Sequence, residues 1–237
     1  MSLLADLSSL PLDLLFPRQC LACTVSLAHP LAASVAPAPA LDRWLCPECR
    51  LQLEPCQPAI LYSDSGANCE KIYSSYYYGT VLKTVIPAWK YHRRPDIFPF
   101  IAALLKNAVS FDALPVVEND LLIPVPLSRR VWRTRGFNQS AFIALNLARQ
   151  FALRLETDLL VKTLETPHQA SLKRRERIRN LAGPVFRIID PAAVAGKRVL
   201  LCDDVTTTGT TLERAAVTLR AAGSGPVSAF TLARTPL

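Results

Sequence analysis

The stretch VLLCDDVTTTGTTL, which begins at Val199, constrains the fold of this chain more than any other. Val199 to Cys202 are typical of a short buried strand, and Asp203 and Asp204 follow at its carboxyl end. Thr206 to Thr211 then form a loop that opens a helix over 211–222. Gly209 lets the backbone turn tightly, so that N–H groups and threonine hydroxyls can converge on one anion at the helix N-terminus. The stretch therefore predicts a phosphate-binding turn between a strand and a helix.

The two acids say more about the ligand of this turn. Asp203 and Asp204 would repel a bare phosphate, but they suit a ligand that also carries hydroxyls or a divalent cation. Two hydrophobic residues, two acids and T-T-T-G-T in this order resemble the phosphoribosyl pyrophosphate (PRPP) motif of type I phosphoribosyltransferases. The alternative is a core strand that ends in an ordinary Asp or Thr helix cap, which accounts for one residue of the constellation. A Walker-type ATP loop is excluded because the chain has no G-x-x-x-x-G-K-[ST].

Segments typical of strands and helices alternate in the rest of the chain after residue 70. A helix is expected over 139–153, and a helical pattern over 81–89 is interrupted at Pro87. The predicted strands cover 72–78, 120–125, 159–164, 186–189, 197–202 and 227–233. This alternation predicts an α/β domain over 71–237 with a mostly parallel sheet and flanking helices, preceded by a small segment over 1–70. Ligands of such sheets gather at the carboxyl ends of the strands.

Two C-x-x-C pairs dominate the segment before residue 70. Cys20 and Cys23, with Cys46 and Cys49, can present four thiolates in two turns, a common way to close a structural zinc site of the zinc-ribbon type. The interval between the pairs exceeds the usual spacing, and the Pro/Ala-rich run LAASVAPAPA lies inside it. Two disulfides or four uncoordinated thiols are the alternatives. Cys56 and Cys69 are expected to be ordinary small residues and not ligands of a second zinc.

The amino-terminal region does not predict a signal peptide or a membrane span. MSLLADLSSLPLDLLF is apolar, but it lacks a basic start, contains Asp6 and Asp13, and breaks at Pro11. The uncharged run from Leu21 to Leu41 contains three prolines, which argue against a spanning helix. We therefore expect a soluble, cytoplasmic protein in which the thiols stay reduced and available to zinc.

The net charge of +8 is concentrated in two clusters. One contains Arg129, Arg130, Arg133 and Arg135, and the other runs from Lys173 to Arg179. Either cluster could attract an anion, although such a run is often only the solvated face of a helix. The first cluster directly follows a predicted strand that ends in Pro124-Val125-Pro126, which favours a role at the ligand site. Tyr76, Tyr77, Tyr78, Trp89 and Trp132 could stack on bases, but such residues more often lie in a core or at its rim.

Nearly the whole chain resembles the ComF family, which includes GntX-like proteins and joins a cysteine-rich zinc segment to a type I phosphoribosyltransferase domain. The resemblance is carried, in this order, by FPRQCLAC, LCPEC, AWKYHRRPD, LIPVPLSRR with RTRGFNQ, QASLKRRERIRN, and the VLLCDDVTTTGTTL loop followed by LAR. It implies structural Zn²⁺ on the four cysteines and Mg²⁺ bound together with PRPP.

The resemblance also implies roles for single residues. Asp203 and Asp204 would hold the ribose hydroxyls, directly or through Mg²⁺, and would be the catalytic acids of the site. The 5′-phosphate would be held by Thr206, Thr207, Thr208, Gly209 and Thr210. Arg133, Arg135 and the segment 169–180, with Arg177, would close on pyrophosphate as a lid.

Two functions are compatible with this site. The resemblance implies a role in natural competence, in the uptake or handling of single-stranded DNA, with a competence helicase or recombination protein as partner. The alternative is an active phosphoribosyltransferase of nucleotide or amine metabolism, without a DNA role, in which a nitrogen nucleophile displaces pyrophosphate from the ribose. The sequence does not identify the acceptor.

Overall fold

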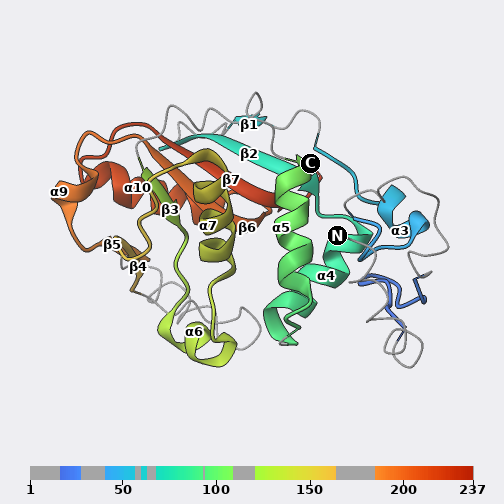
Figure 1. Ribbon diagram of the computed structural model, residues 1–237. Coiled ribbons are helices and arrows are strands. Elements are labelled where there is room, and N and C mark those ends of the chain that lie inside the picture. The colour runs from blue at the N-terminus through green and yellow to red at the C-terminus, as the bar shows by residue number, and fades with distance from the viewer. Residues whose placement is uncertain are drawn as a thin grey trace, which may run out of the picture. The chain divides into compact units, whose positions relative to one another are not determined.

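The computed structural model describes residues 17–27, 41–56, 60–62, 68–92, 94–108, 121–163 and 185–236 of the 237-residue chain (Figure 1). The chain forms two compact units. One comprises Met1–Glu54 and Tyr78–Asn107, and the other comprises Pro55–Tyr77 and Ala108–Leu237. The boundary predicted between residues 70 and 71 falls inside a strand of the second unit. The predicted division at residue 70 concerns which parts of the chain fold independently. Compactness does not test this, so the division stays a prediction.

A five-stranded sheet forms the centre of the second unit. Its order is β1–β2–β7–β6–β3, and the strands span Ile60–Tyr62, Cys69–Tyr77, Val227–Arg234, Val199–Thr206 and Leu121–Pro124, respectively. The four strands from β2 to β3 pair in parallel, and β1 is antiparallel to β2. Strands β2, β3, β6 and β7 are mostly buried, as both faces of a covered parallel sheet must be. The predicted α/β fold with a mostly parallel sheet is confirmed.

Two helices cover this sheet. The helix α10 (Thr210–Ala221) contributes Leu212, Ala215, Ala216 and Leu219 to a hydrophobic cluster that includes Val199 and Leu201 of β6. The intervening residues of a strand face the opposite side of the sheet. The helix α7 (Gln139–Phe151) contacts β3 and β6 and lies in front of the sheet in Figure 1. Its buried residues recur at helical spacing, from Ile143 and Ala144 to Leu147 and Phe151, which explains why the sequence pattern predicted it.

A two-stranded antiparallel ribbon packs beside α10. It pairs β4 (Leu160–Lys162) with β5 (Phe186–Ile188), and its buried residues join the same hydrophobic cluster. The short helix α9 (Pro191–Val194) follows, capped by the Asp190 carboxylate. The predicted lid over 169–180, Arg177 included, lies outside the described residues.

The first unit contains three described helices: α3 (Pro47–Leu51), α4 (Thr80–Tyr91) and α5 (Ile97–Ala108). The predicted interruption at Pro87 is wrong, because α4 continues through this residue. A proline inside a helix costs about 3 kcal/mol. Burial of apolar side chains in every turn of α4, from Val81 to Trp89, offsets that cost. In the part of the chain that the structure describes, no helix combines the length and hydrophobicity that crossing a membrane requires.

Candidate functional site

The strand β6 carries the two acids at its carboxyl end, and both are fixed by hydrogen bonds. Oδ1 of Asp203 accepts the Ser140 hydroxyl at 2.9 Å and the backbone N–H of Asp204 at 2.9 Å. Oδ1 of Asp204 accepts the N–H of Val205 at 2.7 Å, and Asp204 is buried. Because each carboxylate uses one oxygen in this way, the two are held in fixed orientations at the strand end.

The threonine loop turns directly from β6 into α10, as predicted. Gly209 is the N-cap of α10 and has the left-handed φ of 72° that only glycine adopts readily. A Cβ at this position would lie 3.2 Å from Cδ1 of Ile72 in β2. Thr207, Thr208 and Thr210 are exposed, and the hydroxyls of the last two are 2.8 Å apart. Exposed hydroxyls at the N-terminus of a twelve-residue helix form a surface that favours an anion.

The turn after β3 is joined to the acids by a chain of hydrogen bonds. The Val125 N–H donates to the carbonyl of Cys202, and the Val125 carbonyl accepts Nδ2 of Asn138 at 3.0 Å. Oδ1 of Asn138 caps α7 by accepting the Ser140 N–H at 3.0 Å. The Ser140 hydroxyl in turn binds Asp203. Sequence reasoning missed Asn138 and Ser140, although an asparagine just before an amphipathic helix is a typical N-cap signal.

The two predicted arginines lie on α6 (Arg129–Arg135), a helix that ends at Gly136 with a left-handed φ of 79°. Arg135 donates from Nη1 to Oε1 of the buried Gln139 at 2.7 Å, which ties it to the start of α7. Arg133 is exposed and lines a surface hollow together with other residues of α6. The structure thus directs the two arginines toward different surroundings.

Lys162, at the end of β4, is a further cation that sequence reasoning missed. Its ammonium lies 6.0 Å from the centre of the Phe186 ring. Burial lowers the pKa of Lys162, an effect that nearby Asp203 opposes and Arg214 reinforces. A lysine in a short strand of alternating pattern is usually a solvated residue, so nothing in the sequence distinguished this one.

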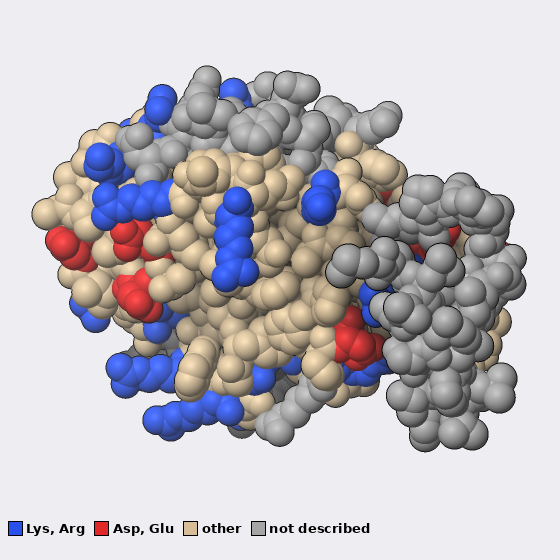
Figure 2. Space-filling view, in the orientation of Figure 1, with Lys and Arg blue, Asp and Glu red and all other residues tan. Residues whose placement is uncertain are grey.

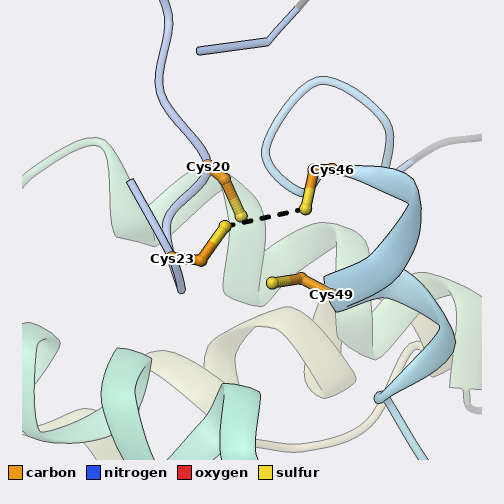
Figure 3. A group of neighbouring side chains, drawn as sticks. All are labelled: Cys20, Cys23, Cys46 and Cys49. Atoms are coloured by element: carbon orange, nitrogen blue, oxygen red, sulfur yellow. Dashed lines mark hydrogen bonds between the residues drawn. The ribbon is translucent and has the colours of Figure 1, made fainter. Parts of the chain in front are cut away.

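The four predicted cysteines gather into one cluster, and Figure 3 shows their side chains pointing toward one another. All four sulfur atoms lie within 4.8 Å of one another, and those of Cys23 and Cys46 are 3.7 Å apart. Four thiolates around one zinc at about 2.3 Å would have sulfur–sulfur distances of about 3.8 Å. The cluster therefore fits a tetrahedral metal and could hold one.

The backbone around the cluster forms the two predicted turns. Thr24 donates its N–H to the Cys20 carbonyl at 2.9 Å, and Arg50 donates to the Cys46 carbonyl at 2.9 Å. No disulfide bond links any of the seven cysteines in the structure, and the sulfur atoms of both C-x-x-C pairs lie in one group. Cys56 and Cys69 are buried and do not belong to the cluster.

Comparison with known proteins agrees with this geometry. The family model "Phosphoribosyl transferase domain" matches residues 139–236. The chain is 32% identical over 201 residues to the "DNA utilization protein YhgH" of Escherichia coli O6:H1. The matched region covers 82% of this chain and 86% of that protein. It is 30% identical over 184 residues to "Competence protein F" of Haemophilus influenzae, covering 73% and 80% of the two chains.

Solved structures show weaker similarity. Orotate phosphoribosyltransferase from Aeropyrum pernix is 18% identical, with a TM-score of 0.36, over 79% of this chain and 78% of that one. The fold assignment above therefore rests on the strand order and pairing of the sheet itself.

Proposed function

Because this chain belongs to the ComF/YhgH family, whose members carry a phosphoribosyltransferase domain, we propose that it binds PRPP with Mg²⁺ and serves in DNA utilisation. The DNA role is supported by the relatives, which are named for DNA utilization and for competence. Within it, the proposed task is the uptake or handling of single-stranded DNA together with a competence helicase or recombination protein.

One observation carries the PRPP part of the proposal: two oriented carboxylates end a strand whose next turn, at Gly209, begins a helix. In the proposed complex, Asp203 and Asp204 accept the ribose hydroxyls directly or hold them through Mg²⁺. Thr206, Thr207, Thr208, Gly209 and Thr210 hold the 5′-phosphate, which the positive end of the α10 dipole favours. The bound Mg²⁺ would supply charge stabilisation for the pyrophosphate.

The remaining residues complete the anion site. Arg133 and Arg135 contribute positive charge after the Pro124-Val125-Pro126 turn, as does Arg177 from the segment that the structure leaves undescribed. Ser140 donates a hydrogen bond to one oxygen of Asp203 and thereby helps to fix the orientation of this carboxylate.

We further propose that the four-cysteine cluster holds a structural Zn²⁺. A closed set of four thiolates leaves no position for a substrate, which is typical of structural and not of catalytic zinc. The metal would supply the cross-link that a short segment with few regular elements otherwise lacks.

Calorimetric titration of the zinc-loaded full chain with PRPP, with and without Mg²⁺, tests the site. We expect magnesium-dependent binding that is abolished in Asp204→Ala and retained in Glu70→Gln, which neutralises an exposed carboxylate of β2. Circular dichroism and thermal unfolding of both variants check that the fold persists. Unchanged PRPP affinity in a folded Asp204→Ala protein would overturn the assignment.

A further inference from the structure

A large cavity opens between the turn after β3 and the β4–β5 ribbon. Its volume is about 850 Å³, within the range of sites that bind small molecules. Among the described residues of its wall, three are cations, Arg129, Lys162 and Arg187, and one is a carboxylate, Asp158. The cavity therefore carries a net positive charge and suits an anionic ligand.

The wall also contains an exposed aromatic ring. Trp132 has 57% of its surface exposed, whereas Trp89 is fully buried. An exposed indole next to cations offers a flat surface on which a nucleobase can stack, and it has no role in the hydrophobic core. Nothing in the proposed PRPP site uses this ring.

The helix α6 extends the positive surface beyond the cavity. Arg129 and Trp132, three residues apart, line the cavity from one side of the helix. Arg129 also lines a second hollow of about 550 Å³ together with Arg130, Arg133 and Thr134. Among the described residues, no salt bridge occupies these three arginines. Figure 2 shows Lys and Arg side chains in the region that α6 occupies in Figure 1.

We propose that α6 and this cavity form a binding surface for single-stranded nucleic acid. One base stacks on Trp132 inside the cavity, and Arg129 binds the adjoining phosphate. Neighbouring phosphates of the same strand lie against Arg130 and Arg133 in the second hollow. A strand fits better than a free nucleotide, because the arginines continue past the space that one nucleotide fills.

This surface specifies the DNA role proposed above and rests on it. The two surfaces share Arg133 and the turn at Pro126, but Asp203, Asp204 and the threonine loop line neither hollow, so the PRPP site and this surface can be tested separately.

The test measures fluorescence anisotropy of a labelled twelve-nucleotide oligothymidylate titrated with the full zinc-loaded chain. We expect Trp132→Ala to weaken binding about tenfold or more, as loss of one stacked base does, and Trp132→Phe to retain most of the affinity. Arg129→Ala should weaken binding and flatten its salt dependence, whereas Arg149→Ala, which removes an exposed charge on α7, is the matched control. Calorimetric titration of Trp132→Ala and Arg149→Ala with PRPP checks that the PRPP site persists in both variants.

The outcomes separate the two proposals. If the wild-type chain fails to bind the oligonucleotide but binds PRPP, the DNA role and this surface are both wrong and the PRPP site stands. If the wild-type chain binds and Trp132→Ala behaves like Arg149→Ala, only this surface is wrong. If thymidine monophosphate competes as strongly as the oligonucleotide, the cavity takes a free nucleotide, and a strand along α6 is ruled out.

Discussion

Gly209 is the position at which the strand-to-helix turn tolerates least change. Its left-handed φ and the nearby Ile72 side chain are separate constraints, one on the backbone and one on the space around it. Gly196 shares the first constraint, with a φ of 67°, but has nothing within 4 Å of an added Cβ. The two glycines therefore form a natural comparison.

We expect Gly209→Ala to reduce the free energy of unfolding by more than the roughly 1–2 kcal/mol that a left-handed alanine costs. Gly196→Ala should cost only that backbone term. Chemical denaturation of both variants measures the difference. Adding Ile72→Val, which removes the contacting methyl group, should recover part of the loss in Gly209→Ala; equal losses at both glycines would show that Ile72 does not matter.

Site residues that form a local sequence pattern could be predicted. Site residues whose partners lie far away in the chain could not. The order of Asp203, Asp204 and the threonines specified a strand that ends in two acids and a turn into a helix, without knowledge of the sheet. The bond between Ser140 and Asp203 joins positions 63 residues apart, and no local pattern announces it. Lys162 was missed for the same reason, because its surroundings come from β5 and β6.

The contact between α10 and the start of β2 is a second such long-range link. The Glu213 carboxylate accepts three hydrogen bonds, from the N–H and Nδ2 of Asn68 and from the N–H of Cys69, at 3.0 to 3.1 Å. Burial raises the pKa of Glu213, but these donors outweigh it and hold the pKa below its ordinary value of 4.5. The helix that begins after Gly209 is thereby attached to a neighbouring strand.

Glu213→Gln should therefore destabilise the protein by about 1–2 kcal/mol at neutral pH, because the amide keeps one acceptor and turns an NH₂ group toward a donor. Since the folded pKa is lowered, the stabilisation is fully present above pH 4.5 and is lost as the pH falls through the folded value. Urea unfolding at pH 7 and at successively lower pH measures both effects. A stability difference that does not shrink in acid would contradict this account of the carboxylate.

Among the elements, those with strong periodicity were predicted and those shaped by packing were not. The predicted strands over 72–78 and 227–233 and the helix over 139–153 match β2, β7 and α7 to within a few residues. Pro87 misled the reading of α4, because tertiary burial outweighed a local preference. The sequence indicated only a cluster of positive charge where α6 lies. A seven-residue helix without buried residues has no periodic pattern of apolar residues from which it could be predicted.

The two compact units should respond to different ligands. The cysteine cluster belongs to the first unit, and the acids and threonine loop belong to the second. Zinc should therefore stabilise the first unit and PRPP with Mg²⁺ the second, each in proportion to its binding free energy. If zinc stabilises only the first unit and PRPP with Mg²⁺ only the second, the two sites are energetically separate.

We expect the purified chain to contain about one zinc per molecule, and a strong chelator to lower its thermal stability. Cys49→Ser should lose the metal, whereas Cys56→Ala, which changes a buried thiol outside the cluster, should keep it. Elemental analysis and calorimetric melting measure these effects. Retention of full zinc in Cys49→Ser would exclude the four-thiolate site.

The position of β7 has a consequence for how this protein is made. Strand β7 lies between β2 and β6, so it is the parallel partner of both, yet it follows every other strand in the chain. About 150 further residues must therefore be synthesised after β2 before its parallel partner β7 is available. Pairing over such a long sequence separation is slow. Until β7 is made, the acids of β6 lie on a strand whose edge toward β7 is unpaired. The ligand site can become complete only after β7 has been made and has paired with β2 and β6.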